Sequence, residues 1–221
     1  MEFSGDIFPR AGLWLAVGIY AWLSVLALRW ADWGRLRDPD QLHVFLGAVV
    51  GLLVLWSLRT EVQPGFTWHL SAIVTLTLMY GWSLAVVAGS LALAGTTLAG
   101  LNDWAGFAPT ALVSVMLPAL MCQVVLALAR AYLPKHYFVY VFVNAFFAAG
   151  LIALISGLTA AAVLMGTGAF SYERLYDHYL IFLPLMFFPE AMLNGWLMAI
   201  MVGFKPHWVR SFRDEEYLHG K

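Results

Sequence analysis

The chain has 221 residues, a formal net charge of −1, 62% hydrophobic residues and only 11% charged residues. Soluble domains carry about 25% charged residues, so this composition excludes a soluble globular protein. The charge balance offers no basic surface for nucleic acid. The single cysteine, Cys122, excludes an internal disulfide and any multi-cysteine metal site.

Apolar stretches long enough to cross a bilayer, about 17–25 residues each, recur along the chain. They predict an all-α polytopic membrane bundle of about seven transmembrane helices, forming one domain with a short tail at 205–221. The third stretch is the shortest and follows a helix-breaking Pro64-Gly65 pair. The expected spans are residues 11–28, 42–58, 68–81, 84–101, 108–129, 136–165 and 179–204.

Basic residues orient these spans, because cytoplasmic loops of membrane proteins are rich in Lys and Arg. With the N-terminus outside and the C-terminus in the cytoplasm, only Arg10, Arg59 and Arg174 of the twelve Lys and Arg residues lie outside. Treating 68–101 as one helix would give six spans and break this agreement. We therefore expect a multi-pass protein of the cell inner (plasma) membrane. Its cytoplasmic tail either docks a partner or is solvated, and we favour a solvated tail.

Small residues recur every four positions in the sixth span, at Ala145, Ala149, Ala153, Gly157 and Ala161. Such stripes let helix backbones approach closely in lipid. The stripe predicts close packing inside the bundle or, alternatively, docking of a separate membrane partner.

His69 lies one turn into the third span, where a histidine is costly to place. It is either an interfacial histidine bonded to a loop carbonyl or a ligand that points into the bundle. The same outer side carries several groups that are either solvated loop charges or, taken together, suited to a divalent cation: Glu2, Asp6, Glu61, Asp103, Glu173, Asp177 and His178.

Glu190 falls near the middle of the seventh span, with Asn194 one turn further on the same face. A carboxylate at this depth is a functional candidate by default. It either makes a structural polar contact that holds the bundle together or takes part in ion passage or conformational switching. The sequence contains no Walker motif and no G-x-S-x-G elbow, so it does not predict an enzyme, although a membrane enzyme using Glu190 is a weaker alternative.

Three segments resemble a known family. Pro64-Gly65, His69-Leu70 and Gly81-Trp82 resemble the G-x-x-x-H-L-x-G…L-G-P-W segment of the CbiM/NikM-like, cobalt/nickel-type substrate-binding membrane components of energy-coupling-factor ABC transporters. The run from Pro189 to Gly195 resembles the family's closing E-G-x-x-T region, in the longer form of its proteobacterial branch. The run from Val141 to Phe146 also resembles that branch.

The resemblance implies a seven-helix permease that captures a transition-metal ion, Ni²⁺ or Co²⁺, from outside. It also implies two kinds of partner, a transmembrane coupling protein and cytoplasmic ATPase subunits. In the family the ion is held by the N-terminal amine, a histidine at position two and the histidine that matches His69. Here Glu2 replaces the position-two histidine, so Glu2 and Asp6 are candidate oxygen ligands beside His69. Alternatively, the family scaffold is kept with another substrate or with no metal. A further alternative is a non-transporting integral-membrane subunit that packs against a larger complex.

Overall fold

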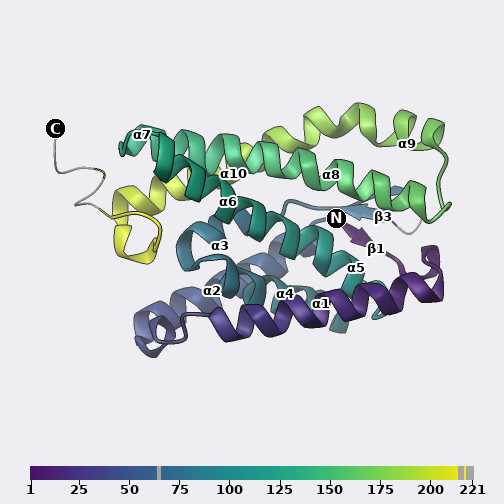
Figure 1. The fold of residues 1–221 in the computed structure, drawn as a ribbon, viewed down its shortest axis with the longest axis horizontal. Coiled ribbons are helices and arrows are strands. Elements are labelled where there is room, and N and C mark those ends of the chain that lie inside the picture. Colours follow the sequence, from purple (N-terminus) through teal and green to yellow (C-terminus); the bar gives the residue numbers. More distant parts are fainter. Residues whose placement is uncertain (64–65, 214–216, 218–221) are drawn as a thin grey trace.

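The computed structural model describes residues 1–63, 66–213 and 217, and it shows an elongated helical bundle with a small sheet near one end (Figure 1). The strands are β1 (Glu2–Phe3), β2 (Thr60–Gln63) and β3 (Phe66–Trp68), in the order β1-β3-β2 with antiparallel pairing. The α-helices are α1 (Arg10–Trp30), α2 (Pro39–Ser57), α3 (Ile73–Tyr80), α4 (Trp82–Leu98), α5 (Phe107–Ala111), α6 (Leu117–Tyr132), α7 (Tyr137–Val139), α8 (Ala148–Gly166), α9 (Tyr172–His178) and α10 (Leu183–Phe204).

Shorter turns join these helices. A π-helical segment, Leu112–Met116, links α5 to α6 just before Pro118. Proline has no N–H to continue the regular ladder, and π-type bulges absorb such breaks. A second π segment, Tyr140–Phe147, joins α7 to α8, and 3₁₀ turns occupy Gly5–Ile7, Arg35–Arg37, Leu180–Phe182 and Pro206–Trp208. The π-helical segments therefore join their flanking helices into two long continuous helices, Phe107–Tyr132 and Tyr137–Gly166.

Five helical segments of the described chain are long and apolar enough to cross a membrane, and a shorter apolar helix, Trp82–Leu98, accompanies them. The expected all-α polytopic membrane fold is confirmed at this level. The number seven and the direction of insertion stay predictions. The five segments are Arg10–Trp30, Pro39–Ser57, Phe107–Tyr132, Tyr137–Gly166 and Tyr172–Phe204.

The third expected span differs from the structure. The prediction of a helix from Trp68 is wrong, because Trp68 ends strand β3 and α3 starts only at Ile73. Its eight residues span about 12 Å, and all eight are buried. Ala72, in the left-handed region at φ 54°, sets the direction in which α3 begins, and Gly81 at φ 86° separates α3 from α4. Pro64-Gly65, which suggested the break, lies outside the described residues.

The short helix α3 is closed at both ends by segments far away in the chain. At its start, Glu190 and Asn194 of α10 accept backbone N–H groups. At its end, the N–H groups of Arg210 and Ser211 donate to the carbonyls of Met79 (2.9 Å) and Leu78 (3.1 Å). Because a helix leaves its terminal groups unpaired, these contacts allow so short a helix to sit in the core.

The expected solvated tail is therefore wrong for part of 205–221. Val209, Ser211, Phe212 and Tyr217 are buried. Residues 214–216 and 218–221 lie outside the described part of the chain.

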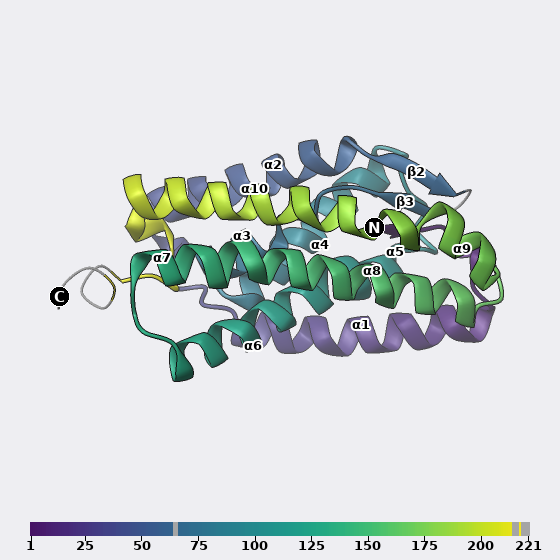
Figure 2. The ribbon, with the colours of Figure 1, turned by 90° about the horizontal axis from the view of Figure 1, so that it is seen from above.

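The small-residue stripe packs inside the bundle. Ala145, Ala149, Gly157 and Ala161 are buried, and α8 lies beside α10 (Figure 2). A Cβ placed on Gly157 would stand 2.5 Å from Cδ2 of Leu183 in α10. These small residues therefore allow α8 and α10 to approach each other closely.

Candidate metal centre

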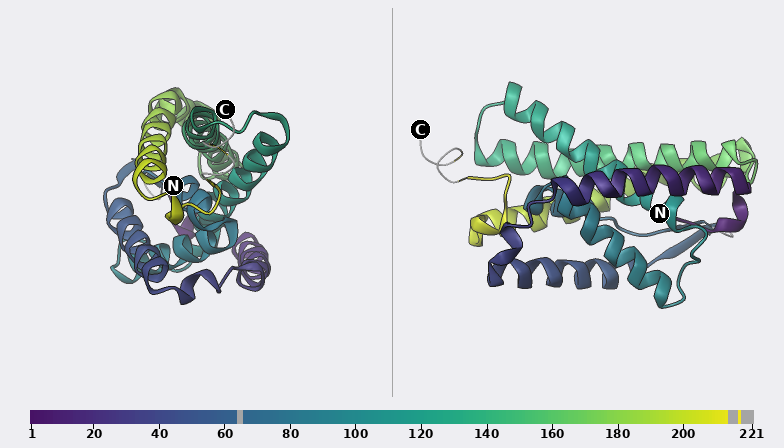
Figure 3. Two further views of the ribbon diagram at one scale, coloured as in Figure 1. Left: turned by 90° about the vertical axis from the view of Figure 1, so that its left-hand side faces the viewer. Right: turned by 60° about the horizontal axis from the view of Figure 1, so that its bottom comes forward.

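The first residues of the chain enter the bundle instead of lying on its surface. Seen along the bundle, the N-terminus falls among the helices (Figure 3). Strand β1 pairs Glu2 with Thr67 and Phe3 with Phe66 of β3. The N–H of Phe3 also donates to the hydroxyl of Thr110 in α5 at 2.9 Å. These contacts fix Met1 beside the segment that follows β3.

A second anchor holds the chain just after β1. The carboxylate of Asp103 accepts hydrogen bonds from the Ser4 hydroxyl (2.8 Å) and the Gly5 N–H (2.9 Å). Burial tends to raise the pKa of Asp103, but N–H donors from Gly5 and Gly106 and the Ser4 hydroxyl together lower it. A Cβ on Gly106 would collide with the Phe3 carbonyl, so glycine is required where these two backbones meet.

Met1 and His69 meet in the interior. The amino nitrogen of Met1 lies 2.9 Å from Nε2 of His69, and His69 is only 2% exposed. Nδ1 of His69 lies 3.0 Å from the Leu70 carbonyl oxygen, so Nδ1 carries the proton and Nε2 presents its lone pair. Histidine ligands of metal ions are typically held in this way by a second hydrogen bond.

Both nitrogen groups are held neutral near pH 7. Burial lowers the pKa of the Met1 amine to about 6, and the charges of Glu2 and Glu190 oppose this shift without cancelling it. Burial also lowers the pKa of His69 well below its usual value, and the charge of the amine acts in the same direction. The site therefore offers two unprotonated nitrogen donors, the form in which amine and imidazole bind metals.

Glu2 lies close to this pair but is engaged by other groups. One carboxylate oxygen accepts from Arg59 (2.7 Å) and Thr67 (3.1 Å), and the other accepts from Asn102 (3.0 Å). Oε1 of Glu2 is 3.7 Å from Nε2 of His69. Since His69 is neutral, this contact is not an ion pair. Glu2 thus ties β1 to Arg59 and Asn102, with one oxygen facing the site.

Asp6 is not brought to the same place. It lies in the turn Gly5–Ile7 and is exposed, and it does not line the cavity beside His69. His178 is also exposed, and its Nδ1 contacts the Arg174 carbonyl. Within the described residues, no three His, Cys, Asp or Glu side chains form a metal-binding group. An ion at His69 would therefore need ligands of other kinds, and the Met1 amine is the nitrogen group that lies beside His69.

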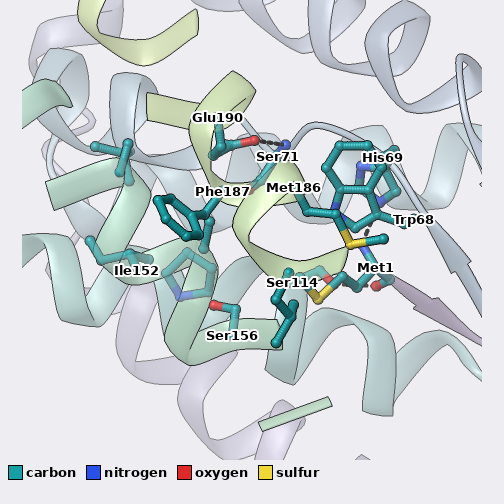
Figure 4. Close-up of a pocket in the computed structure, with 15 residues that line it drawn as sticks. Met1, Trp68, His69, Ser71, Ser114, Ile152, Ser156, Met186, Phe187 and Glu190 are labelled. Carbon is teal, nitrogen blue, oxygen red and sulfur yellow. Dashed lines mark hydrogen bonds between the residues drawn. The ribbon is translucent and has the colours of Figure 1, made fainter. Parts of the chain in front are cut away.

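A cavity of about 30 Å³, more than the roughly 10–15 Å³ that one water needs by this measure, extends inward from Met1 and His69. Its far walls include Ser156 and Glu190, and Figure 4 shows these side chains around the same space. The hydroxyl of Ser114 donates to the Met1 carbonyl. The buried hydroxyl of Ser156 has no hydrogen-bond partner among the described residues. The cavity thus joins the two ionisable features singled out in the sequence.

Glu190 and Asn194 organise the start of α3. The carboxylate of Glu190 accepts from the N–H groups of Ser71 (2.7 Å) and Ala72 (2.8 Å) and from the Asn194 amide (2.9 Å). The Asn194 carbonyl in turn accepts from the N–H and hydroxyl of Thr75. A carboxylate at a helix N-terminus is electrostatically favourable. These bonds describe a structural contact between α10 and α3.

Sequence patterns did not identify several residues of the site. Arg59 and Asn102 fall between expected spans, and Thr110 and Ser114 fall within the expected span 108–129. Each acts on the N-terminal residues over a long separation in sequence, up to 113 residues for Ser114. A carboxylate that is buried needs hydrogen-bond donors around it. This need of Glu2 for donors was the one signal in the sequence that could have pointed to Arg59 and Asn102.

Comparison with known proteins identifies the family. The model of the family described as CbiM, cobalt uptake substrate-specific transmembrane region, matches residues 4–213. The chain belongs to this family of transport components and is a multi-pass membrane protein. No curated protein and no solved structure matches it.

Proposed function

We propose that this chain captures Co²⁺ or Ni²⁺ at the outer face of the inner membrane and releases it inward. The observation that carries the proposal is the 2.9 Å separation of the Met1 amine and His69 Nε2. Two nitrogen donors at about 2.0–2.1 Å from one ion, at right angles to each other, stand about 2.9 Å apart. The pair can therefore bind one ion with little movement, and nitrogen donors suit late first-row metals.

Glu2 serves in this proposal chiefly to position the amine. Its oxygen nearest to His69 already accepts a hydrogen bond from Asn102, which holds that oxygen 3.7 Å from Nε2. Asp6 is left out of the proposed ligand set because its side chain is exposed away from the cavity. With two strong nitrogen donors and at most one carboxylate oxygen, we expect weaker and less selective binding than a nitrogen-rich site provides.

Energy for release comes from other chains in this proposal. The sequence has no nucleotide-binding motif of its own. The resemblance to energy-coupling-factor permeases supports a transmembrane coupling protein and cytoplasmic ATPase subunits as partners. Co-purification of an ATPase subunit is the expected result. Purification with a membrane complex that lacks one would instead favour the alternative, a non-transporting subunit.

Metal titration tests the site directly. Calorimetric titration of the detergent-purified protein with CoCl₂ and NiCl₂ is expected to show one site, which His69→Ala removes. His178→Ala is the matched control, since His178 is an exposed histidine that contacts only its own helix in the described structure. Unchanged affinity in a folded His69→Ala variant would overturn the proposal.

A further inference from the structure

The helices α1 and α6 finish at the end of the bundle that lies away from the N-terminus (Figure 1, Figure 3). Residues from this end line a second hollow. Its volume is about 640 Å³. The end of α1, the α3–α4 junction, the end of α6 and the segment after α10 enclose it. Thus four regions distant in sequence build one polar hollow, which has no role in the metal site.

The described charged side chains that line this hollow are all basic. Its lining includes Arg130, Lys135, Arg210 and Arg213, and no Asp or Glu of the described residues. Arg210 and Arg213 also line an adjoining hollow of about 480 Å³, together with Arg35 and Asp32. A concentration of guanidinium groups in a concave site attracts a multivalent anion.

Arg130 and Arg210 supply the charge on which the inference depends. Arg130 donates to the Ser211 carbonyl at 2.7 Å, a partner that carries no charge. Arg210 lies 3.4 Å from the Tyr80 carbonyl and 3.8 Å from Asp32, in a pair whose side chains are 50% and 44% exposed. So exposed a pair is weak. Each guanidinium has five N–H donors, so these contacts leave donors to face the hollow.

The backbone gives Arg210 its position. A Cβ on Gly81, whose φ is 86°, would stand 2.6 Å from Nη1 of Arg210. The guanidinium therefore lies directly on the glycine that joins α3 to α4. Any side chain at position 81 would displace it.

The surroundings of the hollow are those of a membrane interface. Trp30 and Trp82 line it, and their rings pack edge to face with ring centroids 5.9 Å apart. Trp30 is 66% exposed, and the same helix exposes Val25 and Leu28 as it approaches the hollow. Indoles gather at the headgroup level of bilayers, and exposed aliphatic side chains below them suit acyl chains.

We propose that this hollow binds the phosphate group of an anionic membrane lipid. The guanidinium groups of Arg130 and Arg210 would hold the phosphate oxygens, while the acyl chains run along the exposed face of α1. Basic pockets between membrane helices recognise acidic headgroups in this manner. The indoles and the apolar approach along α1 favour a lipid over a free phosphate ion.

Native mass spectrometry and thermal shift test the proposal on the full-length protein in neutral detergent. Dioctanoyl phosphatidylglycerol is expected to bind and raise the melting temperature, whereas dioctanoyl phosphatidylcholine and inorganic phosphate are not. The double variant Arg130→Gln/Arg210→Gln is expected to weaken binding about tenfold or more. The variant Arg130→Lys/Arg210→Lys keeps both charges and is expected to retain most of the lipid binding. It shows whether substitution at these two positions by itself disrupts folding.

The matched control is Arg29→Gln/Arg37→Gln, which removes two exposed arginines near the same end of α1 that do not line the hollow. Equal loss of lipid binding in this control would overturn the site, because the effect would then be general charge. Unchanged binding in Arg130→Gln/Arg210→Gln would overturn it as well. A shift by inorganic phosphate as large as that by the lipid would overturn the lipid assignment.

Discussion

The amino nitrogen of Met1 lies 2.9 Å from Nε2 of His69, a residue 68 positions later in the chain. The first strand brings the chain end to this point by pairing with β3, and Asp103 and Thr110 hold it there. A chain terminus that is normally frayed is in this protein a buried chemical group, and several predictions depend on it.

Displacing the amine is expected to weaken metal binding. One extra serine before Met1, left by protease cleavage, moves the amino group and replaces it with an amide nitrogen, which is a poor ligand. We expect Co²⁺ affinity to fall at least tenfold, about 1.4 kcal/mol, by calorimetry. A serine added after Lys221 is the control. Equal affinity of the two extended proteins would show that the amine is not a ligand.

Acidification is expected to destabilise the metal-free protein. The pKa of the Met1 amine falls from 8.0 to about 6 in the folded state, so between these values the unfolded chain binds more protons. Stability therefore increases with pH from 6 to 8, by about 2–3 kcal/mol. The lowered pKa of His69 acts in the same direction below about pH 6.5.

Melting curves in detergent from pH 5.5 to 8.5 measure this dependence. The serine-extended protein, whose amine is moved, is expected to show a smaller slope. A melting temperature that falls between pH 6 and pH 8 in the original protein would contradict the burial of a neutral amine.

Replacing Glu2 separates positioning from ligation. Glu2→Gln removes the charge that faces Arg59, whose side chain is 20% exposed, and we expect a loss of about 1–3 kcal/mol of stability. If Glu2 only positions the amine, Co²⁺ affinity measured below the melting transition changes little. Asp6→Asn is the control for a lost negative charge and is expected to change neither the stability nor the Co²⁺ affinity. A large loss of affinity with unchanged stability would make Glu2 a ligand.

Restoring a nitrogen ligand at position two is expected to tighten binding. Glu2→His places an imidazole next to the amine, which the family resemblance associates with a nitrogen-rich site. Because Arg59 would then lose its ion pair, the double variant Glu2→His/Arg59→Gln is the cleaner test. We expect higher Ni²⁺ affinity than in Arg59→Gln alone. Equal Ni²⁺ affinity in Glu2→His/Arg59→Gln and in Arg59→Gln would argue that the site of this protein differs in geometry from the family's nitrogen-rich site.

Removing the Glu190 carboxylate is expected to affect folding before metal capture. Glu190→Gln turns one accepting oxygen into a donor facing the N–H groups of Ser71 and Ala72. An unsatisfied buried donor costs about 1–3 kcal/mol, so the melting temperature falls while Co²⁺ affinity is retained. Leu185→Ala, at an exposed position of the same helix, is the control. Full stability with lost cobalt uptake in cells would instead assign Glu190 to ion passage.

Local sequence was sufficient for the helical fold but not for the third span. Long apolar runs such as Arg10–Trp30 and Pro39–Ser57 predict helices because a backbone in lipid must satisfy its own hydrogen bonds. The run after Trp68 is equally apolar, yet residues 69–72 are not helical. There, Glu190 satisfies the backbone from another helix, which no local pattern reveals.

By itself the sequence determined that this is an apolar, multi-helix membrane protein and that His69 and Glu190 are its unusual polar residues, because hydropathy and residue type are local properties. Only the tertiary structure decided that Met1 reaches His69, that Glu2 is held by Arg59 and Asn102, and that Asp6 remains outside. Those relations arise from pairing and packing between segments far apart in the chain, where the cost of burying a charge or an N–H group selects the partner.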